Sequence, residues 1–250
     1  SDNTLRFSSN AAERIRIDSS GRLLLGHNAS RASAGGEPIL QVQKNTSELA
    51  TFIRTSNDSG AGYIALAKSR SSGGAACQAG DNIGVIGWFP HDGTDLNHAA
   101  AEIRAYVDTG IGSNDVPGYL TFFTNGGTTT ASERMRILSS GDVGLGTTSP
   151  TKPSSSNNST RYMEIASGDG ADLILSNNVS SNIGAGAHIG TLAFKNIDSS
   201  TGSVPHYAGI RCEAADTSGN MDLRFYTGIN KLESDTPQML IDSVGNVGIG

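Results

Sequence analysis

Apolar and polar residues alternate along short stretches of the chain, most clearly in ERMRILSSGDVGLG, which spans residues 133–146. Met135 and Ile137 precede a Ser-Ser-Gly-Asp sequence, and Val143 and Leu145 follow it. Period-two alternation on both sides of a turn sequence predicts a β-hairpin with one apolar face. Gly141 stands in the turn, where we expect a positive φ that other residues resist.

The same pattern occurs near the start of the chain and again in its last residues, which indicates an internal repeat. Residues 13–26 match residues 133–146 at 9 of 14 positions, and residues 237–250 match residues 133–146 at 7 of 14. The turn glycines of these two copies are Gly21 and Gly245. The apolar faces of the three predicted hairpins comprise Ile15, Ile17, Leu23, Leu25, Met135, Ile137, Val143, Leu145, Met239, Ile241, Val247 and Ile249.

Further correspondences divide the chain into homologous modules. Leu40-Gln-Val42 resembles Met163-Glu-Ile165, and residues 83–88 resemble residues 189–194. We predict module one at 38–146, with its hairpin at 133–146, and module two at 161–250, with its hairpin at 237–250. Residues 1–26 are then the C-terminal part of a preceding module with its own hairpin. Segments 27–37 and 147–160, small, polar and rich in Gly, Pro or Ser, are predicted linkers.

Module one is longer than module two between these correspondences. Leu40 and its counterpart Met163 are 123 positions apart, whereas Ile83 and its counterpart Ile189 are 106 positions apart. The difference predicts an insertion between about Asn57 and Ile83, which includes the strand-like residues 62–67.

Composition agrees with an all-β protein that contains many turns. Glycine contributes 32 residues, and charged residues are 17%, below the usual ~25%. The net charge of −6, without a basic stripe, argues against a nucleic-acid partner. No apolar run approaches the ~18 residues of a membrane-spanning helix, so we expect no membrane insertion. Cys77 and Cys212 fall in different modules, which favours two reduced thiols over a disulfide.

An isolated hairpin of this sequence cannot be stable. Burying its four apolar side chains contributes ~6–12 kcal/mol at most. Ordering its fourteen backbone residues costs on the order of 14–28 kcal/mol. Something else must cover the apolar face, either a neighbouring domain or copies of the same hairpin from other chains.

Residues 133–150, ERMRILSSGDVGLGTTSP, closely resemble a recurrent motif of bacteriophage tail fibre and related appendage proteins. Leu138, Asp142 and Leu145 depart mildly from the usual motif, which has Asp, Asn and Ile there. The resemblance implies a parallel homotrimeric fibre in the virion, whose modules are joined by glycine-rich hairpin necks around the trimer axis. It implies a structural role in extending toward the host cell and attaching to it. The implied partners are other copies of the chain, other fibre or virion proteins, and a host surface glycan or protein receptor.

Surface loops are the places where the chain has candidate binding residues. The segment 89–100, FPHDGTDLNHAA, carries His91, Asp92, Asp95 and His98. With Tyr63 and Tyr207 from other segments, these side chains are candidates for stacking on sugar rings and hydrogen bonding to them. Trp88 precedes this loop at the position of Phe194 in an alternating strand, which favours a core position.

The sequence supports catalysis and metal binding less than it supports a structural role. A glycosidase needs two carboxylates ~5–10 Å apart, and the candidates are Asp92, Asp95, Glu102, Asp108, Asp198, Glu213 and Asp216. Solvated loop acids explain these residues more simply, and the spacing of His91 and His98 matches no zinc site. We therefore expect no catalytic residue, metal or cofactor. The alternatives are a glycan-binding or polysaccharide-degrading fibre domain, or a bacterial surface filament or adhesin that uses the same repeat.

Overall fold

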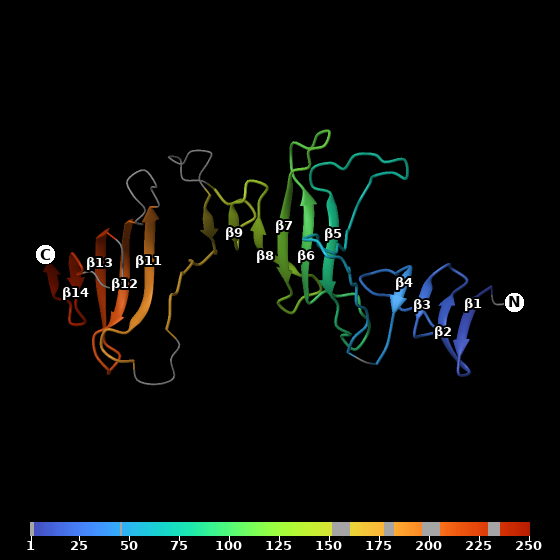
Figure 1. The fold of residues 1–250 in the computed structure, drawn as a ribbon, viewed down its shortest axis with the longest axis horizontal. Helices are drawn as coiled ribbons and strands as arrows, with labels where there is room; N and C mark the ends of the chain where they lie inside the picture. Colours follow the sequence, from blue (N-terminus) through green and yellow to red (C-terminus); the bar gives the residue numbers. More distant parts are fainter. Residues whose placement is uncertain (1–2, 46, 152–160, 178–182, 197–205, 230–235) are drawn as a thin grey trace. The chain divides into compact units, whose positions relative to one another are not determined.

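The computed structural model describes residues 3–45, 47–151, 161–177, 183–196, 206–229 and 236–250 (Figure 1). These residues form fifteen β-strands and no helix, which confirms the predicted all-β fold for the described part of the chain. Accordingly, the described residues include no helix suited to crossing a membrane. The chain divides into two compact units, residues 1–171 and 172–250.

The first unit contains two sheets and the second contains one. The four-stranded sheet has the order β1 (Leu5–Ser9), β2 (Ala12–Ile17), β3 (Leu23–Leu25), β4 (Leu40–Val42). The six-stranded sheet has the order β10 (Met163–Ile165), β9 (Val143–Leu145), β8 (Ser132–Ile137), β7 (Gly118–Thr124), β6 (Ala101–Val107), β5 (Asn82–Trp88). The five-stranded sheet has the order β11 (His188–Asn196), β12 (His206–Ala214), β13 (Met221–Ile229), β14 (Met239–Ile241), β15 (Val247–Ile249).

The three repeat copies form antiparallel pairs with one common register. In the copy at 133–146, Met135 lies opposite Leu145 and Ile137 lies opposite Val143. The corresponding residues of β2 and β3, and of β14 and β15, pair in the same way. All four apolar positions of each copy therefore lie on one face of its sheet.

Each hairpin turn closes on a glycine in the left-handed region. Gly21, Gly141 and Gly245 have φ values of +77°, +85° and +91°. In the first copy the Asp18 carboxylate accepts the backbone N–H groups of Ser20 and Arg22, at 2.9 and 3.0 Å. In the third copy, the Asp242 carboxylate accepts the equivalent N–H groups of Val244 and Asn246. The second copy has Leu138 at the position of this aspartate. There, the turn retains its backbone bond from the N–H of Gly141 to the carbonyl of Leu138, at 2.8 Å.

A parallel strand follows two of the hairpins and pairs with their outer edge. β4 pairs with β3, so that Leu23 lies opposite Leu40, and β10 pairs with β9, so that Val143 lies opposite Met163. Residues 163–165, which the sequence assigns to module two, thus belong to the sheet that contains the hairpin of module one. The two compact units divide after Ala171, and residues 152–160 of the second predicted linker lie outside the described residues.

One face of each sheet carries charged side chains that pair with each other. The Arg16 guanidinium donates two hydrogen bonds to Glu13, at 2.6 and 2.8 Å, and Arg136 donates two to Glu133, at 2.8 and 2.9 Å. In the five-stranded sheet, Arg211 and Arg224 both contact Glu213 at 2.6 Å. Several members of these faces are buried, namely Glu102, Thr121, Arg211, Glu213 and Asp222.

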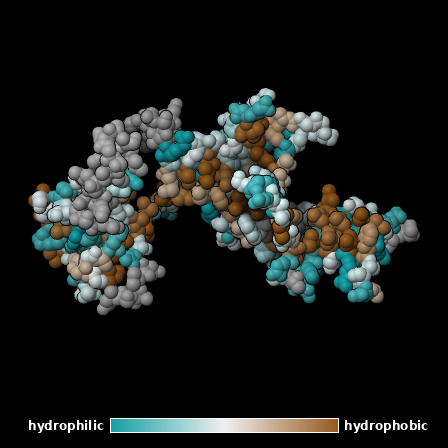
Figure 2. All heavy atoms as spheres, in the orientation of Figure 1, coloured by the Kyte–Doolittle hydropathy of each residue, from teal (hydrophilic) through white to brown (hydrophobic). Residues whose placement is uncertain are grey.

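The opposite face of each sheet is apolar, and within one chain most of its side chains are half-buried or exposed. Figure 2 shows hydrophobic side chains gathered over β1–β4 and over β8 and β9. The exposed apolar residues on these faces are Leu5, Phe7, Ile17, Leu40, Val42, Ile86, Trp88, Met163, Leu192, Phe194, Met221, Leu223, Val247 and Ile249.

Two expectations about module one are wrong. Trp88 is not in a core but is 52% exposed on the apolar face of β5, because no described segment covers its side chain fully. Residues 62–67 form no strand. Instead, Leu66 packs against Gly84 as Leu175 packs against Gly190, since a Cβ built on either glycine would lie 2.7 Å from that leucine's Cβ. Residues around Leu66 therefore correspond to those around Leu175 and are not part of an insertion.

The close approach of the parallel strand can be tested at Gly146. An alanine there would be strained by about 1–2 kcal/mol in the left-handed conformation, and its Cβ would lie 2.1 Å from the carbonyl oxygen of Ala166. We expect Gly146→Ala to displace β10 and to accelerate hydrogen exchange of the Ala166 amide, which donates to Leu145 at 2.8 Å.

Gly21→Ala is the matched control, because Gly21 also has a positive φ but has no atom within 4 Å of its built Cβ. It should leave the exchange of the Gln43 amide, the counterpart of Ala166, nearly unchanged. An Ala166 amide that exchanges at the wild-type rate in Gly146→Ala would contradict the parallel pairing.

Candidate functional site

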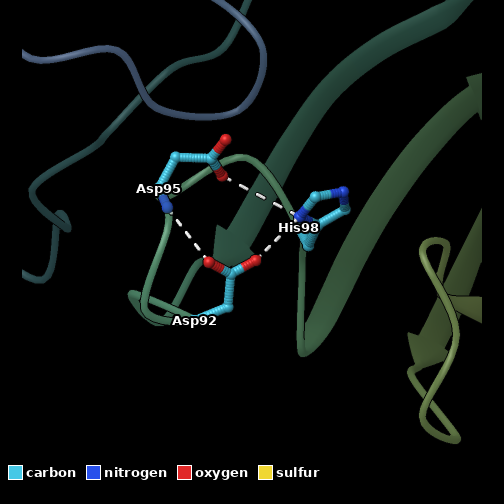
Figure 3. Close-up of side chains that lie close together, drawn as sticks. All are labelled: Asp92, Asp95 and His98. Carbon is cyan, nitrogen blue, oxygen red and sulfur yellow. Dashed lines mark hydrogen bonds and ion pairs between the residues drawn. The ribbon is translucent and has the colours of Figure 1, made fainter.

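The loop between β5 and β6 brings three of the predicted site residues together (Figure 3). His98 Nδ1 lies 3.1 Å from Asp92 Oδ2 and 3.8 Å from Asp95 Oδ1. The ligand-type atoms of the three side chains all lie within 4.8 Å of one another. Turn bonds within residues 92–98 build this cluster. The loop is also held from outside, because the Gly35 N–H donates to Asn97 Oδ1 and the Ala34 N–H donates to the carbonyl of Leu96, both at 3.0 Å.

An aspartate turn fixes the position of Asp92. Its Oδ1 accepts the backbone N–H groups of Thr94 and Asp95, at 2.8 and 3.0 Å, and the N–H of Asp92 donates to the carbonyl of Asp95 at 3.2 Å. The N–H groups of Asp95 and Thr94, followed by His98, lower the pKa of Asp92 to about 2. Asp92 is therefore an anion at neutral pH, and His98 lies beside that negative charge.

The cluster is satisfied by its own groups. Two carboxylates and an imidazole are ligands that divalent transition metals accept. However, Asp92 Oδ1 already accepts two backbone N–H groups, and Asp92 Oδ2 faces His98. The contact of 3.1 Å between His98 Nδ1 and Asp92 Oδ2 accounts for the arrangement, so the geometry gives no separate reason for a cation.

A hollow beside the cluster offers polar groups to a ligand. It is lined by Pro90, Asp92, His98, Ala99, Ala100, Asn125 and residues 127–129. Asn125 shapes its far wall by accepting the N–H groups of Gly127 and Thr128, both at 2.9 Å, and by donating to the carbonyl of Ala99 at 3.1 Å. The Asn-Gly-Gly sequence at 125–127 is a turn signal that could have identified this wall from the sequence.

The remaining predicted contact residues are not among those that line this hollow. His91 precedes the cluster, and its Nδ1 faces the N–H of Gly93 at 3.0 Å, so the imidazole serves the turn itself. Tyr63 is 89% exposed in the segment before β5. Tyr207 belongs to the second compact unit, where Lys195 Nζ lies 5.7 Å from the centre of its ring. Only Asp92, Asp95 and His98 are thus brought together by an interaction that the structure describes.

Most of the candidate carboxylates are held by hydrogen bonds or ion pairs within the chain. A general acid for glycoside cleavage needs a raised pKa. The Ser139 hydroxyl lowers the pKa of Asp108, and the side chain of Asn220 lowers that of Asp216, as backbone N–H groups do for Asp92. Glu102 and Glu213 are buried in ion pairs with arginine. Asp198 lies outside the described residues.

The chain is similar to two solved structures of a bacteriophage T5 fibre. One is the carboxy-terminal domain of the L-shaped tail fibre, with 15% sequence identity, a TM-score of 0.43 and coverage of 80% of this chain and 90% of that chain. The other is the same domain with its intra-molecular chaperone domain, with 14% identity, a TM-score of 0.39 and coverage of 80% of this chain and 62% of that chain. No protein-family model matches the sequence, and no curated protein does.

The aspartate turn predicts a specific acid titration. Since the pKa of Asp92 is lowered from 3.8 to about 2, its hydrogen bonds stabilise the loop fully above about pH 4, and this contribution is lost as the pH falls toward 2. NMR of the full chain should show the Thr94 and Asp95 amide signals titrating together with a midpoint near 2. In Asp92→Asn this titration should disappear. A midpoint of 3.8 or above in the wild type would mean that the two amides do not donate to Asp92.

Proposed function

We propose that this chain is a structural segment of a bacteriophage tail fibre, in which three parallel copies pack the apolar faces of their sheets around a common axis. The observation that carries the proposal is that the two faces of each sheet differ in how well the chain covers them. In each sheet the charged face is paired by the chain's own residues, whereas most side chains of the apolar face are only half-buried or are exposed.

Physical chemistry makes such a surface unstable in water. Monomeric proteins rarely expose contiguous apolar patches larger than a few hundred Å². Here Phe7, Trp88 and Phe194 are all exposed, and each lies on the apolar face of a different sheet. Burial of these faces against other copies is favourable by roughly 25 cal/mol for each Å² of apolar surface removed from water.

The hairpins place the same apolar pattern at three positions along the chain. Their four apolar residues are half-buried in the first two copies, apart from Ile17, which is exposed. Parallel association would bring identical hairpins from each copy to the same level, so that each supplies the missing cover for its neighbours. The number three comes from the resemblance of residues 133–150 to the tail fibre motif.

Irregular segments add further apolar surface for the same partners. Leu49, Phe52, Ile53, Ile64 and Leu66 are exposed in the segment before β5, and Leu173, Ile174 and Leu175 are exposed before β11. These segments have strand-like sequences but belong to no sheet of the described chain. Neighbouring copies supply both the apolar cover and the strand edges that these segments lack.

A fibre of this kind acts through its length and stiffness, and no reaction is required of it. The segment spans distance between the virion and the host surface, together with other fibre or virion proteins, and so contributes to host attachment. The hollow beside Asp92 and His98 offers hydrogen-bonding groups for weak contacts with a surface glycan, which is the second candidate function. A glycan array with the wild type and with His98→Ala tests this separately from association.

The oligomeric state tests the main proposal. Light scattering of the full chain should give three times the 25.8 kDa mass of one chain. Ile86→Asp should weaken the trimer, because Ile86 lies on the apolar face and is already 56% exposed within one chain. Its fold should survive, since a charge there is hydrated in the monomer.

Val85→Asp is the matched control. Val85 is the preceding residue of the same strand, points to the opposite face and is 39% exposed. It should leave the trimer intact. A wild-type mass of a single chain, or equal weakening by both variants, would contradict association through the apolar faces.

A further inference from the structure

The three hairpins of the chain differ at their outer edges. β3 and β9 each carry a parallel strand there, whereas β15 ends the order of the described strands in its sheet. Val247 and Ile249 of β15 are 56% and 82% exposed, while the corresponding side chains of β3 and β9 are half-buried. The third copy therefore presents the edge that the other two copies have covered.

The covered edges share one pattern of hydrogen bonds. In the second copy the N–H of Val143 donates to the carbonyl of Tyr162 at 3.0 Å, and the N–H of Ala166 donates to the carbonyl of Leu145 at 2.8 Å. The first copy makes the same two bonds at 2.7 and 3.0 Å. By register, Val247 N–H and Ile249 C=O are the groups that would make these bonds in the third copy.

A glycine at the end of each hairpin creates space for the parallel strand. Gly26, Gly146 and Gly250 have φ values of +80°, +74° and +105°. Their N–H groups make the same bond to the first strand of the hairpin, at 3.0, 2.9 and 3.1 Å. A Cβ built on Gly26 or Gly146 would lie 2.3 Å from Gln43 O or 2.1 Å from Ala166 O, but a Cβ built on Gly250 meets nothing within 4 Å. The third copy thus has the same recess, with no described atom in it.

The occupied copies also indicate what the occupant must be. Each parallel strand has an apolar–polar–apolar sequence, Leu40-Gln-Val42 or Met163-Glu-Ile165. Its middle side chain accepts a backbone N–H from the preceding linker, from Arg31 to Gln41 at 3.0 Å and from Thr151 to Glu164 at 2.8 Å. Both linker amides lie five residues beyond the glycine that ends the hairpin. The linker and the strand therefore act together.

We propose that the outer edge of β15 is a docking site for one extended segment, which runs parallel to β15 as β4 runs parallel to β3 and β10 to β9. The segment has an apolar residue, then Gln or Glu, then an apolar residue. Its backbone bonds to Val247 N–H and Ile249 C=O, and its chain passes over the recess at Gly250. Two occupied copies within one chain support this site, so it does not depend on how many chains form the fibre.

The experiment supplies this segment to the full chain. Residues 147–167, which contain the linker and strand of the second copy, are appended after Gly250, and hydrogen exchange at the Val247 amide is followed by NMR. A new backbone hydrogen bond should slow this exchange about tenfold or more relative to the unextended chain. Exchange at the Leu223 amide in β13 monitors the integrity of the sheet.

Two variants of the extended chain identify the cause of any protection. Met163→Asp with Ile165→Asp, in the appended copy only, should restore fast exchange because the strand can no longer bury its apolar side chains. Gly250→Ala should do the same, because its Cβ would occupy the recess. Unchanged exchange at Val247 in the extended chain, or protection that survives both variants, overturns the proposal. Protection in the unextended chain that grows with protein concentration also overturns it, since a second copy would then be the occupant.

Discussion

Ion pairs on one face of each sheet determine which face the chain can close by itself. Charged groups can leave water only when they are paired. The Glu13–Arg16 and Glu133–Arg136 pairs meet this condition within single strands. The apolar residues that alternate with these charged residues, such as Ile15 and Met135, point to the other face of the sheet. There the chain provides little cover. The exposed apolar faces, and with them the proposed association, follow from this division.

The division is kept even where the repeat sequence changes. In module one, Thr121 of β7 lies opposite Arg136 of β8. In module two the corresponding positions are Arg224 of β13 and Leu240 of β14. The arginine has moved to the neighbouring strand but stays on the same face, where it contacts Glu213. Both modules therefore keep an arginine on the paired face, although it stands at a different position of the repeat in each. This is expected if the fold requires a charge on that face and does not require it at one particular position.

The hairpins could be predicted from the sequence because their signals are local. Alternation around Gly21, Gly141 and Gly245 defines both strands and the turn within fourteen residues, and the register follows from the apolar face. The parallel strands could not be predicted, since Leu40-Gln-Val42 and Met163-Glu-Ile165 are three-residue segments that pair across an intervening linker. Their similarity marked them as repeats but did not indicate a partner.

The candidate site and Trp88 show two further limits of the sequence. Asp92, Asp95 and His98 lie together because of backbone bonds in one turn, and residue types alone do not reveal which carboxylate accepts those bonds. Trp88 has the pattern of a core residue, yet the core that an alternating strand predicts need not lie in the same chain. In a protein whose apolar faces are covered by other copies, alternation predicts correctly which face is apolar and gives no information about what covers it.

The pairing of β4 and β10 with the preceding hairpins changes how the predicted linkers transmit force along the chain. Segments 27–37 and 147–160 have the composition of flexible connectors, which would allow successive modules to move independently. Because β4 and β10 bond to the hairpins that precede these segments, the strands on either side of each segment lie side by side in one sheet. Segment 27–37 is therefore a crossover connection within a sheet and not a hinge. At both hairpins, a pull along the chain is carried first by the hydrogen bonds of the strand pair. A stiff fibre can in this way be built from a sequence that has flexible composition between its modules.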